Sequence, residues 1–268
     1  MTTQLSGPRA ILDPQIVAEQ LAKITLSAGG HKSSEAGMCV MEAVSYIAGE
    51  RFSSQPECAC PVITGFMVSF NDTLLDNAAR DRWIKPLIPA IAGSRVFQAN
   101  GTEDEDVLMR RSLIAGDAAL RHFFPFTLDI AAESFAEYSS KAWARDGAKF
   151  FTARAAWLRA LPEQTSFEDL ALAGRTVFAA LTDVADRADI TLCADFSALG
   201  YLSTPGDSSA LGYLADLAEI AATAAAAART NLAGLAASDQ INEARVATVL
   251  KMLAVQSKVA APATLLAT

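Results

Sequence analysis

Residues 61–74, PVITGFMVSFNDTL, carry the clearest secondary-structure signal of this chain. Pro61 suits the first position of a helix, because that position needs no backbone N–H for an intrahelical bond. Apolar side chains then recur three or four residues apart, at Ile63, Phe66, Met67, Phe70 and Leu74. This spacing places them on one face of an α-helix. The stretch therefore predicts an amphipathic helix and points to a helical fold.

The same helical period returns along most of the chain, and it is interrupted by recognisable start signals. Helix starts are predicted at Asp13-Pro14, Pro61, Asp76, the capping boxes Thr102–Glu105 and Ser166–Asp169, and Asp239. A long alanine-rich helix is expected from about 210 to 236, since alanine has the highest helix propensity. We therefore predict an all-α, multi-helix bundle of about nine to eleven helices at typical helix lengths.

The domain organisation is predicted from changes in composition. Residues 1–258 are expected to form a single helical domain, and 259–268 a loose C-terminal tail. A boundary near 161–166 is the alternative, because it separates a half rich in Cys, Phe and Trp from a half rich in Ala.

Composition excludes several classes of function. The chain has 268 residues, a net charge of −8 and a pI near 4.8. No basic run exceeds Arg110-Arg111, so nucleic acid is not expected as the main partner. The least polar stretch, 210–237, contains Asp216, Glu219 and Arg229, which does not fit a membrane span. With no signal peptide visible and only four cysteines, a cytoplasmic location with free thiols is expected.

Reactive residue types concentrate between 39 and 60. In a helix predicted near 38–49, Cys39, Glu42, Tyr46 and Glu50 would fall within about a third of the helix circumference. Such a stripe could line the pocket of a small-molecule enzyme, joined by His31 or Asp72. Glu42 would then be a general base with a raised pKa, and Cys39 a nucleophile. The alternative is a partly solvated helix face with one buried cysteine.

A metal site is the second chemical hypothesis for this segment. Cys39, Cys58 and Cys60 could bind a metal, with a fourth ligand from His31, Glu57 or Cys193. However, paired zinc-binding cysteines are usually two to four residues apart, whereas one residue separates Cys58 from Cys60. A disulfide from Cys39 to Cys58 or Cys60 is disfavoured in a reducing compartment.

No known catalytic or cofactor motif is present, so no cofactor is predicted. The sequence has no glycine-rich nucleotide-binding loop, nucleophile elbow or zinc-protease helix motif. A Ser-His-Asp triad would depend on His31 or His122, and the neighbours of neither indicate one. Asp117 and Arg121 are expected to form an ion pair on a helix surface, while Asn71-Asp72 is expected to cap or solvate a helix end.

Residues 39–50, CVMEAVSYIAGE, with 56–62, PECACPV, resemble a segment of uncharacterised bacterial and bacteriophage proteins that are also alanine-rich and helical toward their C-terminal ends. The resemblance covers residues 38–93. It implies a bacterial or phage source, and it assigns no activity, cofactor or functional residue.

The leading functional hypothesis is a non-enzymatic cytoplasmic protein that acts through helix association with a protein partner or another copy of itself. Its basis is the nearly all-alanine stretch from 221 to 228, because small side chains let helices approach closely. A small-molecule enzyme using Cys39, Glu42, Tyr46 and Glu50 is the first alternative, and metal binding through Cys39, Cys58 and Cys60 is the second.

Overall fold

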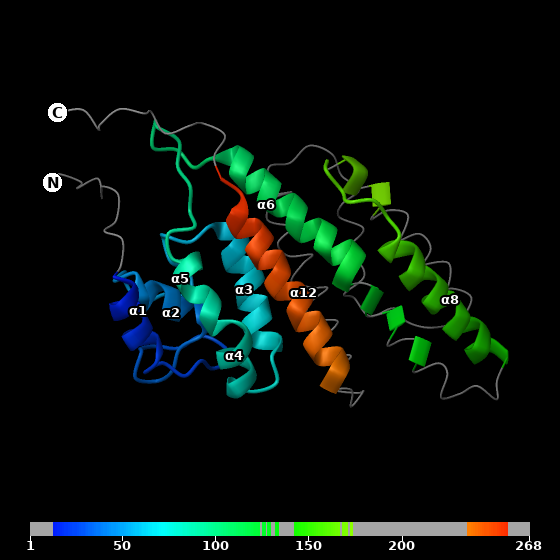
Figure 1. The fold of residues 1–268 in the computed structure, drawn as a ribbon, viewed down its shortest axis with the longest axis horizontal. Coiled ribbons are helices and arrows are strands. Elements are labelled where there is room, and N and C mark those ends of the chain that lie inside the picture. Colours follow the sequence, from blue (N-terminus) through cyan, green and yellow to red (C-terminus); the bar gives the residue numbers. More distant parts are fainter. Residues whose placement is uncertain are drawn as a thin grey trace. The chain divides into compact units, whose positions relative to one another are not determined.

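The computed structural model describes residues 13–123, 125–126, 128–129, 132–133, 142–166, 168–170, 172–173 and 235–256. These residues form eight α-helices and no strand, which confirms the predicted all-α character for the described part of the chain. Figure 1 shows the helices in sequence colours. The chain divides into two compact units, Met1–Glu103 and Asp104–Thr268. The division follows Glu103; the single domain over 1–258, with its alternative boundary near 161–166, stays a prediction.

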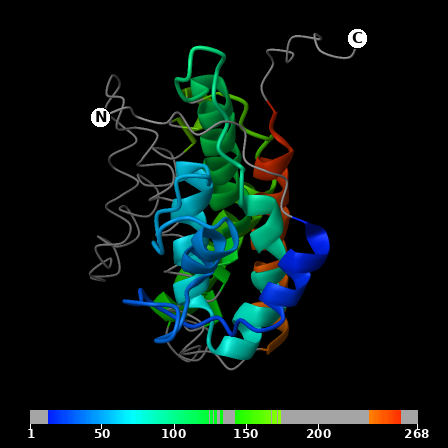
Figure 2. The same ribbon diagram turned by 90° about the vertical axis from the view of Figure 1, so that its left-hand side faces the viewer.

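Unit 1 is built from five α-helices and one 3-10 turn. These are α1 (Pro14–Leu21), α2 (Val40–Ile47), α3 (Pro61–Thr73), α4 (Asn77–Trp83), η1 (Lys85–Leu87) and α5 (Ile88–Ile91). The short helix α2 packs against α3, α5 and α1, as can be followed in Figures 1 and 2. Because α2 touches three other helices, it is the centre of unit 1.

The helix predicted from residues 61–74 is confirmed as α3, which begins at Pro61. Its burial is broader than the predicted single face. Apolar side chains such as Phe66 and Phe70 are buried, and so are the polar side chains of Thr64, Ser69 and Asn71. Buried polar groups need hydrogen-bond partners, and Asn71 has them in a neighbouring loop.

Two helices are shorter than the sequence predicts. The first, expected from 14 to 27, ends at Leu21, and the second, expected from 38 to 49, spans Val40–Ile47. Cys39 is therefore the N-cap of α2, and Glu50 lies beyond its end. Gly49 is the second residue after the last residue of α2. Its φ of 66° is the left-handed conformation in which glycine commonly ends a helix.

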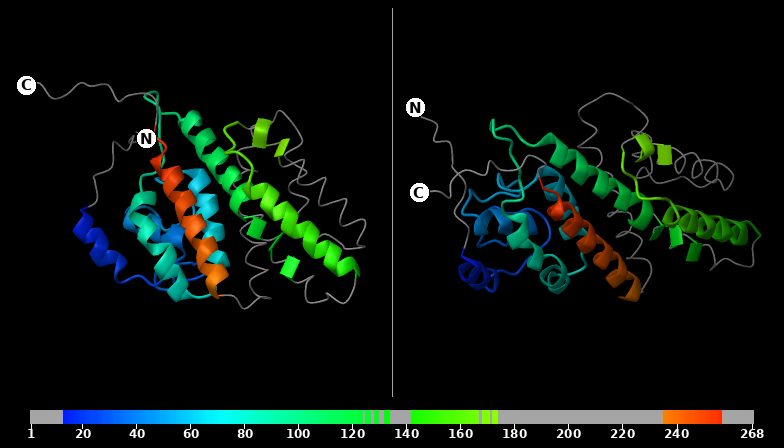
Figure 3. Two further views of the ribbon diagram at one scale, coloured as in Figure 1. Left: turned by 45° about the vertical axis from the view of Figure 1, so that its right-hand side comes forward. Right: turned by 45° about the horizontal axis from the view of Figure 1, so that its top comes forward.

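Unit 2 is described through three long helices. Helix α6 (Glu105–Ala118) continues into a π-helical segment, η2 (Ala119–Phe123), and the others are α8 (Ala142–Arg159) and α12 (Leu235–Ala254). Helix α6 packs antiparallel against α12, as Figures 1 and 3 show. No helix of the described residues is long and apolar enough to cross a membrane.

Capping residues in unit 2 were predicted with mixed success. Asp104, not Thr102, caps α6 by accepting a hydrogen bond from the Val107 N–H at 3.2 Å. Asp239 lies inside α12 instead of capping it. Half of the Ser166–Asp169 box is confirmed, since the Ser166 Oγ accepts a bond from the Asp169 N–H at 3.1 Å, while the Asp169 carboxylate accepts from the Ser166 hydroxyl at 2.7 Å. Two other predictions lie outside the described residues: the alanine-rich helix up to residue 234 and the tail 259–268.

Candidate functional site

The loop from 22 to 39, between α1 and α2, is held in place by polar contacts from other elements. Its Leu26 pairs with Met38 in an isolated β-bridge, and the Ser27 N–H donates to the Met38 carbonyl at 2.8 Å. The Leu26 N–H donates to Asp81 at 3.0 Å. These contacts fold the loop back on itself, so that its two ends lie side by side.

Asn71 and Asp72, at the end of α3, clamp the same loop. The Asn71 amide nitrogen donates to the Ser27 carbonyl at 3.0 Å, while its oxygen accepts from the Val40 N–H at 3.1 Å. Asp72 accepts a bond from the Gly29 N–H at 2.9 Å. The two residues therefore position a loop, beyond the capping role predicted for them.

Glu42 is the buried centre of this arrangement, with 2% of its surface exposed. One carboxylate oxygen accepts from the His31 N–H at 2.7 Å. The other lies 2.8 Å from both His31 Nδ1 and the Cys39 N–H. The Glu42 N–H in turn donates to Cys39 Sγ at 3.5 Å, which completes a capping box at the start of α2.

The carboxyl group of Glu42 is stabilised in its charged form. Burial alone would raise its pKa, but hydrogen bonds from His31 and Cys39 outweigh that effect and lower the pKa below its ordinary value. Glu42 is thus an ionised acceptor, which corrects the expectation of a general base with a raised pKa.

Ser27, His31 and Glu42 form a continuous chain of hydrogen bonds. Because His31 Nδ1 faces the ionised carboxylate, this nitrogen carries the proton in the neutral ring, and Nε2 is left as an acceptor. The Ser27 hydroxyl lies 3.0 Å from that Nε2. A hydroxyl, an imidazole and a carboxylate in this order are the three parts of a serine-nucleophile triad.

Gly37 shows how tightly the loop closes over this chain. A Cβ at Gly37 would lie 2.7 Å from the ring Cδ2 of His31 and 2.9 Å from Ser27 Oγ. The backbone of Gly37 therefore passes directly over the Ser27–His31 contact on one side. Solvent still reaches the ring, since 14% of the His31 side chain is exposed, and Ser27 is half-buried.

Cys39 has the opposite of the properties expected of a nucleophile. The side chain is buried, and desolvation, with the charge of Glu42, raises the pKa of the thiol to about 11. A thiol in that state is protonated near neutral pH and unreactive. Cys39 acts instead as the cap of α2.

Tyr46 and Glu50 do not join Cys39 and Glu42 in one stripe. Tyr46 is 44% exposed, whereas Glu42 is buried. Glu50, past the end of α2, accepts a bond from the Glu57 N–H at 2.7 Å and so holds the turn before α3. The four residues thus do not share one helix face, and of them Glu42 lies in the hydrogen-bonded chain described above.

The three cysteines of unit 1 are free, buried thiols. Cys60 is the N-cap of α3, and its N–H donates to Ser94 Oγ at 3.0 Å. Within the described ranges, no group of three or more His, Cys, Asp or Glu side chains is arranged to hold a metal ion. The structure thus gives the metal hypothesis for Cys39, Cys58 and Cys60 no support, and Cys193 lies outside the described residues.

Two features of the sequence bear on this site. Ser27 and His31 are four residues apart, but they lie in a loop, where a helical pattern search gives them no weight. The capping box has cysteine at the N-cap, whereas the usual signature has serine or threonine. A search for acidic residues three positions after any cap would have paired Glu42 with Cys39.

Comparison with known proteins gives no family for this chain: no protein-family model, no curated protein and no solved structure matches it. The chemistry of unit 1 must therefore be argued from its geometry.

Proposed function

We propose that this chain is a serine hydrolase that cleaves an ester or amide bond through Ser27, His31 and Glu42. The observation that carries the proposal is the unbroken chain from Ser27 Oγ to His31 Nε2 at 3.0 Å and from His31 Nδ1 to Glu42 at 2.8 Å. This replaces the predicted cysteine nucleophile with a serine and gives Glu42 a different role.

Ser27 Oγ would attack the acyl carbon of the substrate while His31 Nε2 takes the hydroxyl proton. A new C–O bond forms, and the electron pair of the carbonyl π bond moves to the carbonyl oxygen, which becomes an oxyanion. As that intermediate collapses, the bond to the leaving group breaks, and His31 returns the proton to the leaving oxygen or nitrogen. Water then cleaves the Ser27 ester by the same proton transfers, which regenerates the free serine.

Glu42 would serve this reaction without exchanging a proton. Its ionised carboxylate fixes the ring of His31 with Nε2 toward Ser27, and it stabilises the imidazolium that forms during attack. The bonds from the His31 and Cys39 N–H groups hold that carboxylate in one orientation. A fixed orientation is what a positioning carboxylate requires.

Labelling with an alkyl fluorophosphonate tests the proposal directly, because this reagent reacts with activated serines. We expect one adduct on Ser27, identified by peptide mass spectrometry, and none in Ser27→Ala. We expect Glu42→Gln and His31→Gln to slow labelling by about 10⁴-fold, the order of loss seen when a triad member is replaced. Ser34→Ala is the matched control, since Ser34 lies in the same loop and its hydroxyl contacts Glu35.

Circular dichroism of each variant separates a lost reaction from a lost fold. Labelling of Ser27→Ala at the wild-type rate would overturn the proposal. So would the absence of any adduct on the folded wild-type protein at millimolar reagent.

We also retain as proposals three predictions that concern the chain as a whole: association through the alanine-rich stretch 221–228, a total of nine to eleven helices, and a cytoplasmic location. Native mass spectrometry tests the first, because a stable multimer or complex of bare chains is its expected result.

A further inference from the structure

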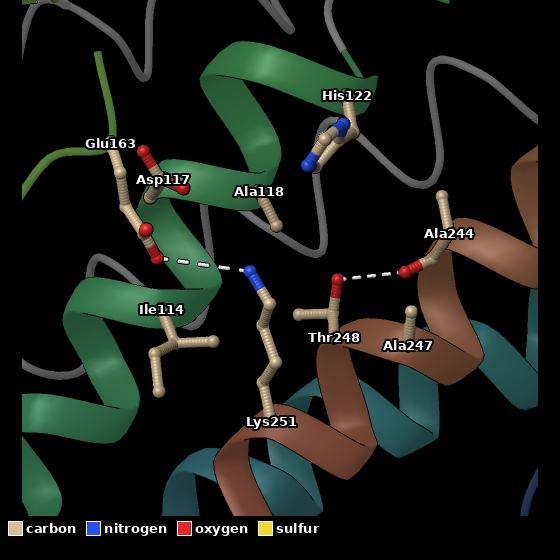
Figure 4. A pocket seen from close by; sticks show the side chains of 9 residues that line it. All are labelled: Ile114, Asp117, Ala118, His122, Glu163, Ala244, Ala247, Thr248 and Lys251. Atoms are coloured by element: carbon tan, nitrogen blue, oxygen red, sulfur yellow. Dashed lines mark hydrogen bonds and ion pairs between the residues drawn. The ribbon is translucent and has the colours of Figure 1, made fainter.

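Unit 2 contains a cavity of about 120 Å³ between the end of α6, the turn after α8, and α12. Figure 4 shows the nine side chains that line it: Ile114, Asp117, Ala118, His122, Glu163, Ala244, Ala247, Thr248 and Lys251. Four of them are alanine or isoleucine. Most of the lining surface is apolar, and ionisable groups are added at particular points.

The ionisable groups gather at the mouth of the cavity. Lys251 and Glu163 are 57% and 60% exposed, and 3.7 Å separates Nζ from the nearer carboxylate oxygen. Ala118 and Thr248, in contrast, are buried. The cavity thus has an apolar interior and a mouth that carries one positive and one negative charge.

The other acidic group at the cavity is already used by the protein. Asp117 accepts a bond from Arg121 Nε at 2.7 Å and from the Gln164 N–H at 2.8 Å. The Asp117–Arg121 ion pair predicted from the sequence is thereby confirmed, and its two charges cancel. Among the described residues that line the cavity, Lys251 and Glu163 are the charged groups that remain accessible to a ligand.

Two polar side chains offer further contacts inside. The Thr248 hydroxyl donates its hydrogen to the Ala244 carbonyl at 2.8 Å. The lone pairs of the hydroxyl oxygen can therefore accept a hydrogen bond from a ligand. The ring of His122 turns a nitrogen toward the same space in Figure 4. Partial burial, with the charge of Arg121, lowers the pKa of His122, so that the neutral ring supplies one donor and one acceptor.

We infer that this cavity binds a small zwitterion, an aliphatic α-amino acid with a short side chain. The carboxylate would lie against Lys251, the ammonium against Glu163, and the side chain against Ile114 and the alanines. The volume supports a small ligand, since sites for drug-sized molecules are about 300–1,000 Å³.

The charge arrangement favours a zwitterion over a singly charged molecule. An exposed ion pair at a distance of 3.7 Å contributes little to stability, so a ligand can separate Lys251 from Glu163 without much loss. A zwitterion then replaces one loose pair with two charge-assisted contacts. An anion would leave Glu163 close to a second negative charge, and a cation would do the same for Lys251.

NMR titration of the labelled full-length chain with three matched compounds tests this inference. L-valine carries both charges, isovalerate lacks the ammonium, and isobutylamine lacks the carboxylate. We expect saturable shifts of the Ala118 and Ala247 methyl groups and of the His122 ring, with valine bound at least about tenfold more tightly than either analogue. Loss of one charge-assisted hydrogen bond typically weakens binding by about this factor.

Three variants locate the site, and two others serve as controls. Lys251→Met and Glu163→Gln should each weaken valine binding about tenfold, while Ala247→Leu should abolish it by filling the cavity. Lys149→Met and Glu243→Gln remove exposed charges that do not line the cavity, and they should bind like the wild type. Equal affinity for valine and isovalerate would overturn the inference, as would no saturable shift or unchanged binding in all three site variants.

Discussion

A single side chain, Glu42, joins helix geometry to the proposed chemistry. As the third residue of α2, it lies near the positive end of the helix dipole and accepts the Cys39 N–H that would otherwise lack a helical partner. The same carboxylate orients the ring of His31. A buried charge is tolerated only with such partners, so the start of α2 and the triad depend on one group.

Gly37 gives a test of how much the closed loop matters. Its φ is 132°, and an added Cβ would come within 2.9 Å of Ser27 and His31 side-chain atoms. We predict that Gly37→Ala destabilises unit 1 by about 2–4 kcal/mol, because backbone strain and a clash add together. Urea denaturation followed by circular dichroism measures this change, and we also expect Ser27 labelling to slow.

Gly49→Ala separates the two contributions. Gly49 also has a positive φ, of 66°, but nothing lies within 4 Å of an added Cβ. We expect a loss of about 1 kcal/mol from backbone strain alone and unchanged labelling of Ser27. Equal losses for the two variants would show that the contact of Gly37 with the triad has no energetic weight.

At the residue scale, the hypothesis drawn from the sequence shares Glu42 and His31 with the site proposed from the structure. The hypothesis identified Glu42 because it would share one helix stripe with Cys39, Tyr46 and Glu50, and it named His31 as a further member. It missed Ser27, since the contact between Ser27 and His31 depends on a loop held by Asn71 and Asp72 from a helix more than forty residues later. No local pattern encodes such a contact.

At the scale of elements, long apolar periodicity predicted helices well and boundaries poorly. The Pro61 start of α3 and the Asp76 cap of α4 are confirmed. Helix α1 ends before its predicted residues Ile24 and Ser27, because the backbone there bonds to Asp81, Lys85 and Met38. Tertiary partners that compete for backbone groups thus decide where a helix stops.

In both units, a tertiary partner also sets the C-terminal end of a helix. A buried arginine donates hydrogen bonds to the last carbonyl groups of that helix. Arg80 donates to the Leu74 carbonyl at the end of α3, at 2.7 Å. Arg111 of α6 donates to the Met252 and Val255 carbonyls at the end of α12, at 2.9 and 3.1 Å. The free carbonyls of a helix end otherwise require water or a cap.

We therefore predict that Arg111→Met destabilises unit 2 by about 2–4 kcal/mol, since it leaves buried carbonyl groups without their charged donor. Hydrogen exchange of the last turns of α12, read by NMR, should accelerate. Arg110→Met is the matched neighbour, because Arg110 is more exposed, donates to the Gln256 carbonyl at the same helix end, and otherwise pairs with Asp106 of its own helix. A smaller effect is expected there, and protection of α12 that is equal in both variants would contradict a special role for Arg111.

At the scale of the whole molecule, no change in amino-acid composition marks the division between the two units after Glu103. It follows a small closed turn in which Arg95 pairs with Glu103 through two bonds, at 3.1 and 3.0 Å, and Gln98 N–H donates to Thr102 at 2.8 Å. Arg95 N–H also donates to the Cys58 carbonyl at 2.9 Å. The turn thereby ties the last residues of unit 1 back to the segment before α3, an arrangement that depends on partners far apart in sequence.

This closure leads to a prediction about unit 1 alone. A fragment of residues 13–103 contains the core around α2 and α3, the loop with Ser27 and His31, and the Arg95–Glu103 pair. We expect it to fold with a cooperative thermal transition, because a compact unit with its own core can fold independently. A fragment of residues 13–94 lacks the closing turn and its bonds to the Cys58 segment, so its transition should lie about 5–10 °C lower. Circular dichroism and fluorophosphonate labelling measure both properties on the same samples, and an unfolded 13–103 fragment, or two fragments of equal stability, would show that the turn does not complete this unit.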